Sequence, residues 1–212
     1  MITTNRRPTP AIDKVLDAAE AEFSERGFAA ARIDDIAARA GMAKSHVYYH
    51  FTGKQEIFDA LVDTRVAEIL QAKDTLFAGI GEEPVAASDL AQLAPQAVGR
   101  LLGERAAFLR IVLQAGLTTD GSAGTNSLLA RVVTPFLDDV AERLTAMGYV
   151  FDAGQLRSDA FHFILLPAVM HVVLGEALPT LIGVSPERAG ELFFIRLAAL
   201  DQQLVNALTE ET

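Results

Sequence analysis

Residues 33–51 read IDDIAARAGMAKSHVYYHF, and this stretch decides how the N-terminal part of the chain is interpreted. Its apolar side chains recur at helical spacing, first as Ile33, Ile36, Ala37 and Ala40, and then as Val47 and Phe51. Gly41 ends the first of these two short helices, and the second begins near Ala43. Two short helices joined by a tight turn that contains Gly predict a helix-turn-helix.

The second of these helices carries hydrogen-bond donors on the face that points away from the core. With about 100° of rotation per residue, Ser45 and Tyr49 lie opposite Val47. His46 and Tyr48 flank them, and Lys44 lies at the margin of the same face. None of these side chains is acidic, and a donor-rich face without acids suits a phosphate-lined groove and base edges.

Helices are also predicted on both sides of this motif. Thr9 and Pro10 form a helix start, and Gly27 is expected to end that helix. Thr52 and Gln55 are expected to form a capping box that opens a long helix to Phe77. At 1.5 Å per residue this helix is about 35 Å long, which is enough to connect two modules.

The distribution of charge agrees with a nucleic-acid partner at the N-terminus. The whole chain has 212 residues and a formal net charge of −10. Residues 1–55 hold eight Lys and Arg and seven Asp and Glu, a net charge of +1, so the remainder carries −11. The acidic character of the whole chain therefore does not exclude a DNA-binding module in its first quarter.

From about Ile12 to Phe58 the sequence resembles the DNA-binding domain of the tetracycline-repressor (TetR) family. The matching stretches are Glu25-Arg26-Gly27-Phe28, Ile33 to Gly41, Lys44, Val47-Tyr48-Tyr49-His50-Phe51 and Lys54-Gln55-Glu56-Ile57-Phe58. The resemblance implies an all-α protein with a three-helix DNA-binding domain at residues 1–53, of which 1–9 are a flexible arm. Residues 54–212 would then form a helical bundle for ligand binding and dimerisation.

The same resemblance implies roles for individual side chains. Bases would be faced by Lys44, Ser45, His46 and Tyr49, and phosphates would be held by Arg32, Tyr48, His50 and Lys54. Two positions depart from the family pattern, because Ala31 stands where Thr is usual and Ala43 where Ser, Thr or an acid is usual. Each replaces a side chain that can cap a helix, at a cost of about 1 kcal/mol. Ser45 and His46 also differ from the usual residues, which puts the operator sequence in doubt more than DNA binding itself.

The rest of the chain also has helical periodicity, which gives about nine helices in total. Residues 118–126 are the most loop-like segment, and a helix is expected from Ser127 to Met147. Asp152 opens a helix to about Gly175, and Ser185-Pro186 opens the last one.

Residues 160–175 contain no Asp, Glu, Lys or Arg, so a helix there must be covered on all sides. This stretch is shorter than the roughly 20 residues of a membrane span. We therefore expect it to pair, together with the last helix, with a second copy of the chain in a four-helix bundle. The expected dimer contacts on the last helix are Leu192, Ile195, Leu200 and Leu204.

The resemblance further implies a ligand pocket inside the C-terminal bundle. The candidate lining residues are Phe77, Gln96, Phe108, Phe136, Phe161, His162, Phe163 and His171. Few charges lie among these apolar stretches, so an apolar or weakly polar small molecule is expected. The long helix that begins at Thr52 would couple this ligand to DNA.

Composition and missing motifs exclude several classes of function. The chain has no Cys, which excludes disulfides, a Cys-ligated metal and a thiol nucleophile. We expect no metal at His46 and His50, no cofactor and no catalytic site, because no nucleophile elbow, phosphate-binding loop or zincin motif is present. No signal peptide or membrane contact is expected, which predicts a cytoplasmic protein.

The function expected from these features is a ligand-responsive repressor that binds a pseudo-palindromic operator as a homodimer. Two alternatives remain open at this point. One is a dimeric small-molecule-binding protein with weak or no DNA binding, and the other is an activator of the same fold.

Overall fold

The structure is a computed structural model that describes residues 9–78, 99, 101–118, 123–146, 148, 152–175, 177–193, 195, 196 and 199. Every regular element in this part of the chain is a helix, as expected for an all-α protein. The elements are α1 (Pro10–Ala30), α2 (Ile33–Arg39), α3 (Lys44–His50), α4 (Lys54–Ala78), α6 (Ala106–Thr118), α7 (Ala123–Ala146), α8 (Ala153–Asp159), the π-helix η1 (Ala160–Leu165), α9 (Leu166–Leu174) and α10 (Ala177–Ile182).

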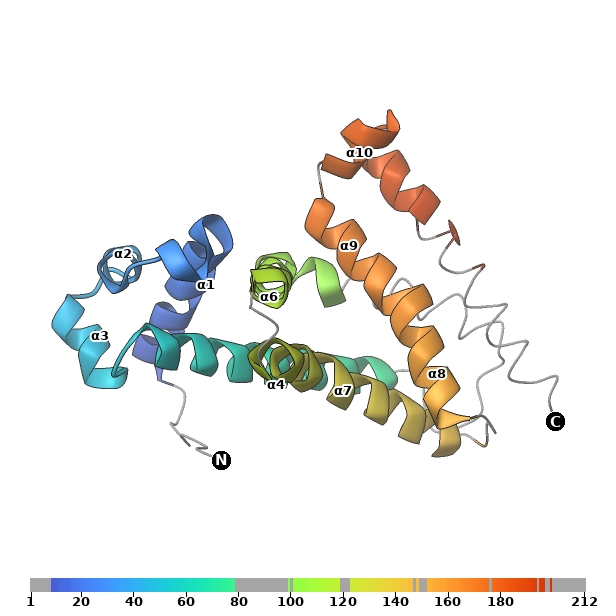
Figure 1. The fold of residues 1–212 in the computed structure, drawn as a ribbon, viewed down its shortest axis with the longest axis horizontal. Coiled ribbons are helices and arrows are strands. Elements are labelled where there is room, and N and C mark those ends of the chain that lie inside the picture. The colour runs from blue at the N-terminus through green and yellow to red at the C-terminus, as the bar shows by residue number, and fades with distance from the viewer. Residues whose placement is uncertain are drawn as a thin grey trace.

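Helices α1 to α3 form a compact unit at one end of the molecule, which we call the head (residues 9–53) (Figure 1). α1 starts as predicted, because the Thr9 hydroxyl accepts a hydrogen bond from the backbone N–H of Ile12. Its predicted inner face is buried and consists of Ile12, Val15, Leu16, Ala19 and Phe23. These side chains pack against Ile36 and Ala37 of α2 and Val47 of α3.

The prediction that Gly27 ends the first helix is wrong in part. Gly27 leaves the helical conformation, with φ 77° and ψ 156°, but helical structure resumes after it and α1 extends to Ala30. Gly27 is therefore a kink within α1. A side chain at this φ would be strained, which explains why Gly is suited to the position.

The long helix α4 leaves the head and runs below α6 toward α7 (Figure 1). It starts at Lys54, and its predicted capping box is displaced by one residue. The carboxylate of Glu56, rather than the side chain of Gln55, accepts the backbone N–H of Thr52 at 2.6 Å and its hydroxyl at 2.7 Å. Because α4 begins one residue later than expected, Glu56 is its third residue and can reach back over the first turn.

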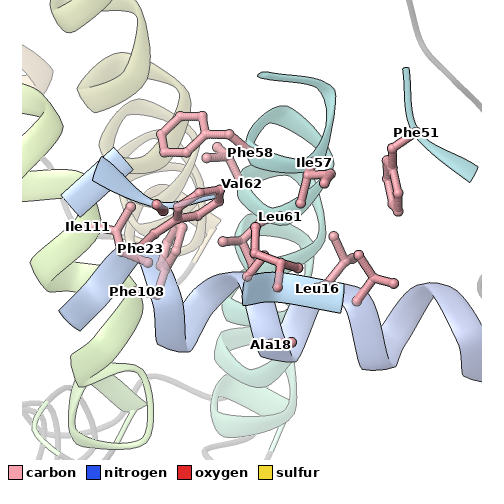
Figure 2. Packing of buried hydrophobic residues seen from close by; sticks show 14 of the residues in the cluster. Leu16, Ala18, Phe23, Phe51, Ile57, Phe58, Leu61, Val62, Phe108 and Ile111 are labelled. Carbon is pink, nitrogen blue, oxygen red and sulfur yellow. The ribbon is translucent and has the colours of Figure 1, made fainter. Parts of the chain in front are cut away.

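The hydrophobic core of the head continues without a break into the C-terminal part. Phe108, Ile111 and Val112 of α6 belong to the same buried cluster as Phe23 of α1 and Phe58 of α4. Figure 2 shows Phe108 and Ile111 directed toward Phe23, with Phe58 and Val62 beside them. α6 is therefore in direct contact with the head, in addition to the covalent link through α4.

The C-terminal part contains two departures from the predicted helices. α7 begins at Ala123, so residues 123–126 are helical although a loop was predicted there and the helix was expected from Ser127. α10 was not predicted, because Ala177–Ile182 is a short segment between Gly175 and Gly183 and lacks a complete periodic face. The helix after Ser185 begins as predicted, with the Ser185 hydroxyl accepting the backbone N–H of Arg188 at 3.3 Å.

One continuous helix runs through α8, η1 and α9, as the sequence predicts. Asp152 caps it by accepting the backbone N–H of Gln155 at 2.7 Å, and Gly175 follows its last residue. One face, which includes Ala168, packs on Leu102 and Leu109. Among the described residues, Ala153–Leu174 is the one helix whose length and composition are sufficient to cross a membrane, which by itself is weak evidence for a span.

Candidate nucleic-acid interface

The position of α3 is fixed by the residues on its inner side and by the turn before it. Val47 is fully buried, and Phe51, directly after the helix, is nearly so. The turn is closed by a hydrogen bond from the Met42 N–H to the Ala37 carbonyl at 2.9 Å, and Gly41 adopts φ 66°. This positive φ favours Gly and sets the direction in which the chain enters α3.

The outer side of α3 has the composition that the sequence predicts. We call this surface the recognition face, and it consists of Lys44, Ser45, His46, Tyr48 and Tyr49. All five are exposed, with Tyr49 80% and Tyr48 47% accessible. A shallow hollow on this face is lined by Ser45, His46 and Tyr49, together with Ala43.

Three aromatic rings of α3 support one another. The rings of His46 and His50 stack with their centroids 5.8 Å apart, and Tyr49 meets His50 edge-on at 5.0 Å. His50 is only half-buried and lies at the side of the recognition face. The contacts restrict the rotamers of His46 and Tyr49, so these two side chains are presented to solvent in a defined arrangement.

Lys44 is held by an acid of the neighbouring helix. Its ammonium lies 2.6 Å from a carboxylate oxygen of Asp34 in α2 and 5.9 Å from the ring centroid of Tyr48. The hydrogen bond to Asp34 raises the pKa of Lys44, which therefore stays charged. The sequence did not predict this pair, although the two residues are ten positions apart on consecutive helices of one motif.

Lys54 has a different environment from the one that the resemblance implies. Its ammonium donates to three backbone carbonyls at the end of α1, those of Phe28 at 2.6 Å, Ala29 at 3.0 Å and Ala31 at 2.9 Å. It also lies 4.7 Å from the ring centroid of Phe28. The side chain thus satisfies carbonyls that the helix leaves without partners, and a phosphate contact remains a proposal that requires it to move.

The N-termini of α2 and α3 show that the expectation of a missing helix cap is wrong for Ala31 and correct for Ala43. The N-cap of α2 is Arg32, and Ala31 is a buried residue before it, so Ala31 does not replace a capping side chain of α2. Arg32 is exposed, as a phosphate contact requires. Ala43 is the N-cap of α3 and provides no side-chain hydrogen bond, in agreement with the sequence analysis.

A cluster of ion pairs fixes α2 against α1. Arg39 binds Glu25 with two nitrogens, at 3.0 and 2.7 Å, and the nearly buried Glu22 at 2.9 Å. Arg26 lies 2.8 Å from Asp35 and forms a further ion pair between the two helices. The bidentate geometry with Glu25 raises the pKa of Arg39 and lowers that of Glu25.

The candidate ligand residues that the structure describes lie in different environments. Phe108 is fully buried and Phe136 partly buried in the core shared with the head. Phe161 is half-buried, whereas His162 and Phe163 are exposed. His171 stacks on Phe193 with a centroid distance of 4.1 Å, and burial lowers its pKa. Gln96 and the side chain of Phe77 lie outside the described residues.

The candidate dimer contacts are consistent with an outward-facing apolar surface. Leu192 and Ile195 are exposed, and Leu200 and Leu204 lie outside the described residues. The helix from α8 to α9 adds a row of exposed apolar side chains. The sequence predicted a dimer contact for this helix but not which of its residues would form it. This row, which we call the outer row, consists of Phe163, Leu166, Met170 and Leu174.

Known proteins share both the head and the overall fold. Residues 15–61 match the family described as bacterial regulatory proteins, tetR family. IcaR, the biofilm operon icaADBC HTH-type negative transcriptional regulator of Staphylococcus aureus (strain Newman), is 40% identical over 50 residues. These residues are 24% of this chain and 27% of IcaR, so the match spans about a quarter of that relative.

Solved structures resemble the chain over most of its length. A TetR-like transcriptional regulator from Rhodococcus sp. RHA1 has a TM-score of 0.61 at 19% identity, covering 91% of this chain and 96% of that one. FadR from Bacillus subtilis, solved in complex with stearoyl-CoA, has a TM-score of 0.59 at 16% identity, covering 92% and 96%. At these identities the likeness shows the fold. The relatives named here are transcriptional regulators rather than enzymes, and residues 15–61 of this chain resemble the tetR family of bacterial regulatory proteins.

Proposed function

We propose that the protein is a transcriptional regulator that inserts α3 into the major groove of a pseudo-palindromic operator. The observation that carries this proposal is the recognition face, where five hydrogen-bonding side chains without an acid stand opposite the buried Val47. Ser45, His46 and Tyr49 would contact base edges, and Arg32, Tyr48 and His50 would hold phosphates. The likeness of residues 15–61 to regulators of the tetR family supports the same role.

We infer that the active form is a homodimer. The outer row on η1 and α9 and the exposed Leu192 and Ile195 supply apolar area that an isolated chain would leave in water. A twofold dimer would place two copies of α3 about 34 Å apart, which is one turn of DNA. The operator would then be two half-sites related by inverted symmetry.

We further propose that the regulator is a repressor, released from DNA by a small, mainly apolar molecule. IcaR is a negative regulator, and FadR from Bacillus subtilis was solved with stearoyl-CoA, a ligand with a long apolar chain. The shared core of α1, α4 and α6 supports coupling, because a shift of α6 would act directly on Phe23 in the head. Such a protein would work in the cytoplasm.

The test is selection of bound duplexes from a random DNA pool, followed by affinity for the selected sequence at several salt concentrations. We expect the selected sequence to be a pseudo-palindrome with half-sites about one turn apart. Its affinity for the protein should fall steeply as the salt concentration rises. No enrichment by the folded dimer at low salt would contradict DNA binding and favour a small-molecule-binding protein. Enrichment only after the Ala43→Ser substitution would mean that the head binds DNA but lacks a helix cap.

Two histidines provide a matched pair of variants for the selected operator. His46 is exposed on the recognition face, and His162 is exposed on η1, far along the chain. Since a base contact is worth about 1–3 kcal/mol, H46A should weaken operator binding about tenfold or more. H162A should leave it unchanged. Equal effects of the two variants would exclude α3 as the element that binds DNA.

A further inference from the structure

The two adjacent acids of α2 have different partners. Asp34 lies 2.6 Å from the Lys44 ammonium, on the recognition face. Asp35 lies 2.8 Å from Arg26, which belongs to the ion pairs between α1 and α2. Both side chains carry the same charge and lie in the first turn of α2. Asp34 contacts a residue of the recognition face, whereas Asp35 contacts a residue that joins α1 to α2.

Asp34 places a negative charge on a surface that otherwise lacks one. α3 itself contains no acid, and the other members of the recognition face are Ser45, His46, Tyr48 and Tyr49. An acid at this position opposes the approach of any phosphate, whatever the DNA sequence. It also neutralises Lys44, the one Lys or Arg within α3.

The pair is easily opened by a suitable competitor. The side chains of Lys44 and Asp34 are 52% and 61% exposed, and ion pairs between exposed groups are weak in water. A phosphate or base acceptor brought close to Lys44 can therefore replace Asp34. A phosphate that stays a few ångströms further away acts on the ammonium through intervening water, and it attracts Lys44 less strongly than Asp34 does in direct contact.

We propose that Asp34 is a specificity-determining residue, which occupies Lys44 until α3 is fully seated in the groove. This inference rests on the proposed DNA-binding function. Non-specific binding is loose and almost entirely electrostatic, so Lys44 stays on Asp34 and adds nothing to it. In the operator complex the base contacts of α3 bring an acceptor to Lys44, and the ammonium exchanges partners. Asp34 thus lowers affinity for wrong sequences more than for the operator.

The experiment compares D34N with D35N on the operator and on a duplex of unrelated sequence, at several salt concentrations. On the unrelated duplex, D34N should increase the salt slope by about 0.9 for each α3 in contact, because Lys44 becomes free to neutralise one phosphate. Over a fourfold range of salt this amounts to about a threefold change in affinity per α3. Operator affinity should change less, so that the ratio of operator to non-specific affinity at the lowest salt concentration falls by up to about threefold for each α3 in contact.

A double-mutant cycle with K44Q assigns the effect to the pair. In a K44Q background, D34N should no longer increase the salt slope, because the cation that it releases is absent. D35N, which removes the same charge from the same helix turn, should produce a smaller change on the unrelated duplex. Circular dichroism of each variant checks that the head remains folded.

The outcomes separate this inference from the proposed function. If the wild-type protein binds its operator but D34N and D35N behave alike, the effect is one of overall charge and the role of Asp34 is contradicted. The same holds if D34N acts equally in the presence and absence of Lys44. If neither the wild-type protein nor D34N binds any duplex, DNA binding fails, and the role of Asp34 fails with it.

Discussion

Lys54 shows how a single side chain can differ from the role that a sequence motif implies. Three carbonyls at the end of α1 surround its ammonium, so in this structure the residue joins the end of α1 to the start of α4. Lys carries its ammonium on a flexible four-carbon stem, so the acceptors that it meets depend on tertiary packing. Lys44, on the recognition face, is by contrast an exposed cation that forms an ion pair with Asp34.

Substitution of the two lysines should therefore affect the stability of the protein to different extents. K54M should lower the free energy of unfolding by about 2 kcal/mol, because it removes a charged donor from three carbonyls that are partly shielded from water. K44M should change stability by no more than about 0.5 kcal/mol, since its ion pair is exposed. Urea unfolding followed by circular dichroism measures both. Equal stability of K54M and the wild-type protein would show that water replaces the ammonium at these carbonyls.

Periodicity predicted the buried and exposed sides of individual residues well. Val47 and Phe51 are buried and Tyr49 is exposed, because the angle around a helix follows directly from residue spacing. It could not predict the partners of Lys54 or Asp34, which are set by how α1, α2 and α3 pack. The roles of the recognition face in contacting bases and phosphates stay predictions.

At the scale of whole elements, α4 and α7 are held together by ion pairs at two places. Arg131 of α7 pairs with Asp63 near the head. Further along, Lys73 of α4 pairs with Asp139 of α7, and Arg143 joins Asp139 at 2.7 Å. Lys73 is only 2% exposed, so its ammonium depends on these acids. The pairs fix the direction of α4 relative to α7 and hence the position of the head.

Asp139 and Asp138 allow this arrangement to be tested with neighbouring substitutions. D139N should lower the free energy of unfolding by about 2 kcal/mol, because it leaves the buried ammonium of Lys73 with only the more distant Asp74. D138N should cost no more than about 0.5 kcal/mol, since Asp138 pairs with Arg157 on the surface. Similar losses from both substitutions would contradict the special role of the buried pair.

The pH dependence of stability should differ between the same two variants. Burial raises the pKa of Asp139, but the hydrogen bonds from Lys73 and Arg143 outweigh it, and the net shift is downward. A lowered pKa in the folded state stabilises the protein above the ordinary Asp value of about 4, and this contribution is lost as the pH falls further. The free energy of unfolding, measured in urea between neutral and acidic pH, should therefore fall less steeply with decreasing pH for D139N than for D138N.

Element boundaries show where the sequence was informative and where it was not. Thr9, Asp152 and Ser185 cap helices as predicted, because their side chains act on amides three residues away. Gly27 and residues 123–126 were misinterpreted, because Gly, Thr and Asn favour turns locally, whereas a helix can resume after one non-helical Gly and can include such residues. α10 was missed because six residues are too few for a periodic pattern.

At the scale of the whole molecule, the helix from α8 to α9 has two apolar sides and only one of them is covered. Its inner side packs on Leu102 and Leu109, whereas the outer row is 37–48% exposed. The four side chains are spaced by three or four residues, which is the spacing of a helix seam that packs against another helix.

Met170 lies in the middle of this row and provides the sharpest test of the proposed dimer. M170E should convert the dimer to a monomer at micromolar concentration, because a carboxylate buried between apolar side chains costs several kcal/mol unless it finds a partner. Sedimentation velocity measures the mass directly. The control is L181E on α10, which replaces an apolar side chain that is 81% exposed and should leave the dimer intact. Because a dimer reads two half-sites at once, M170E should also weaken operator binding while keeping its preference among half-sites. A dimer that survives M170E would place the interface elsewhere, and the outer row would then have to be covered by other parts of the same chain.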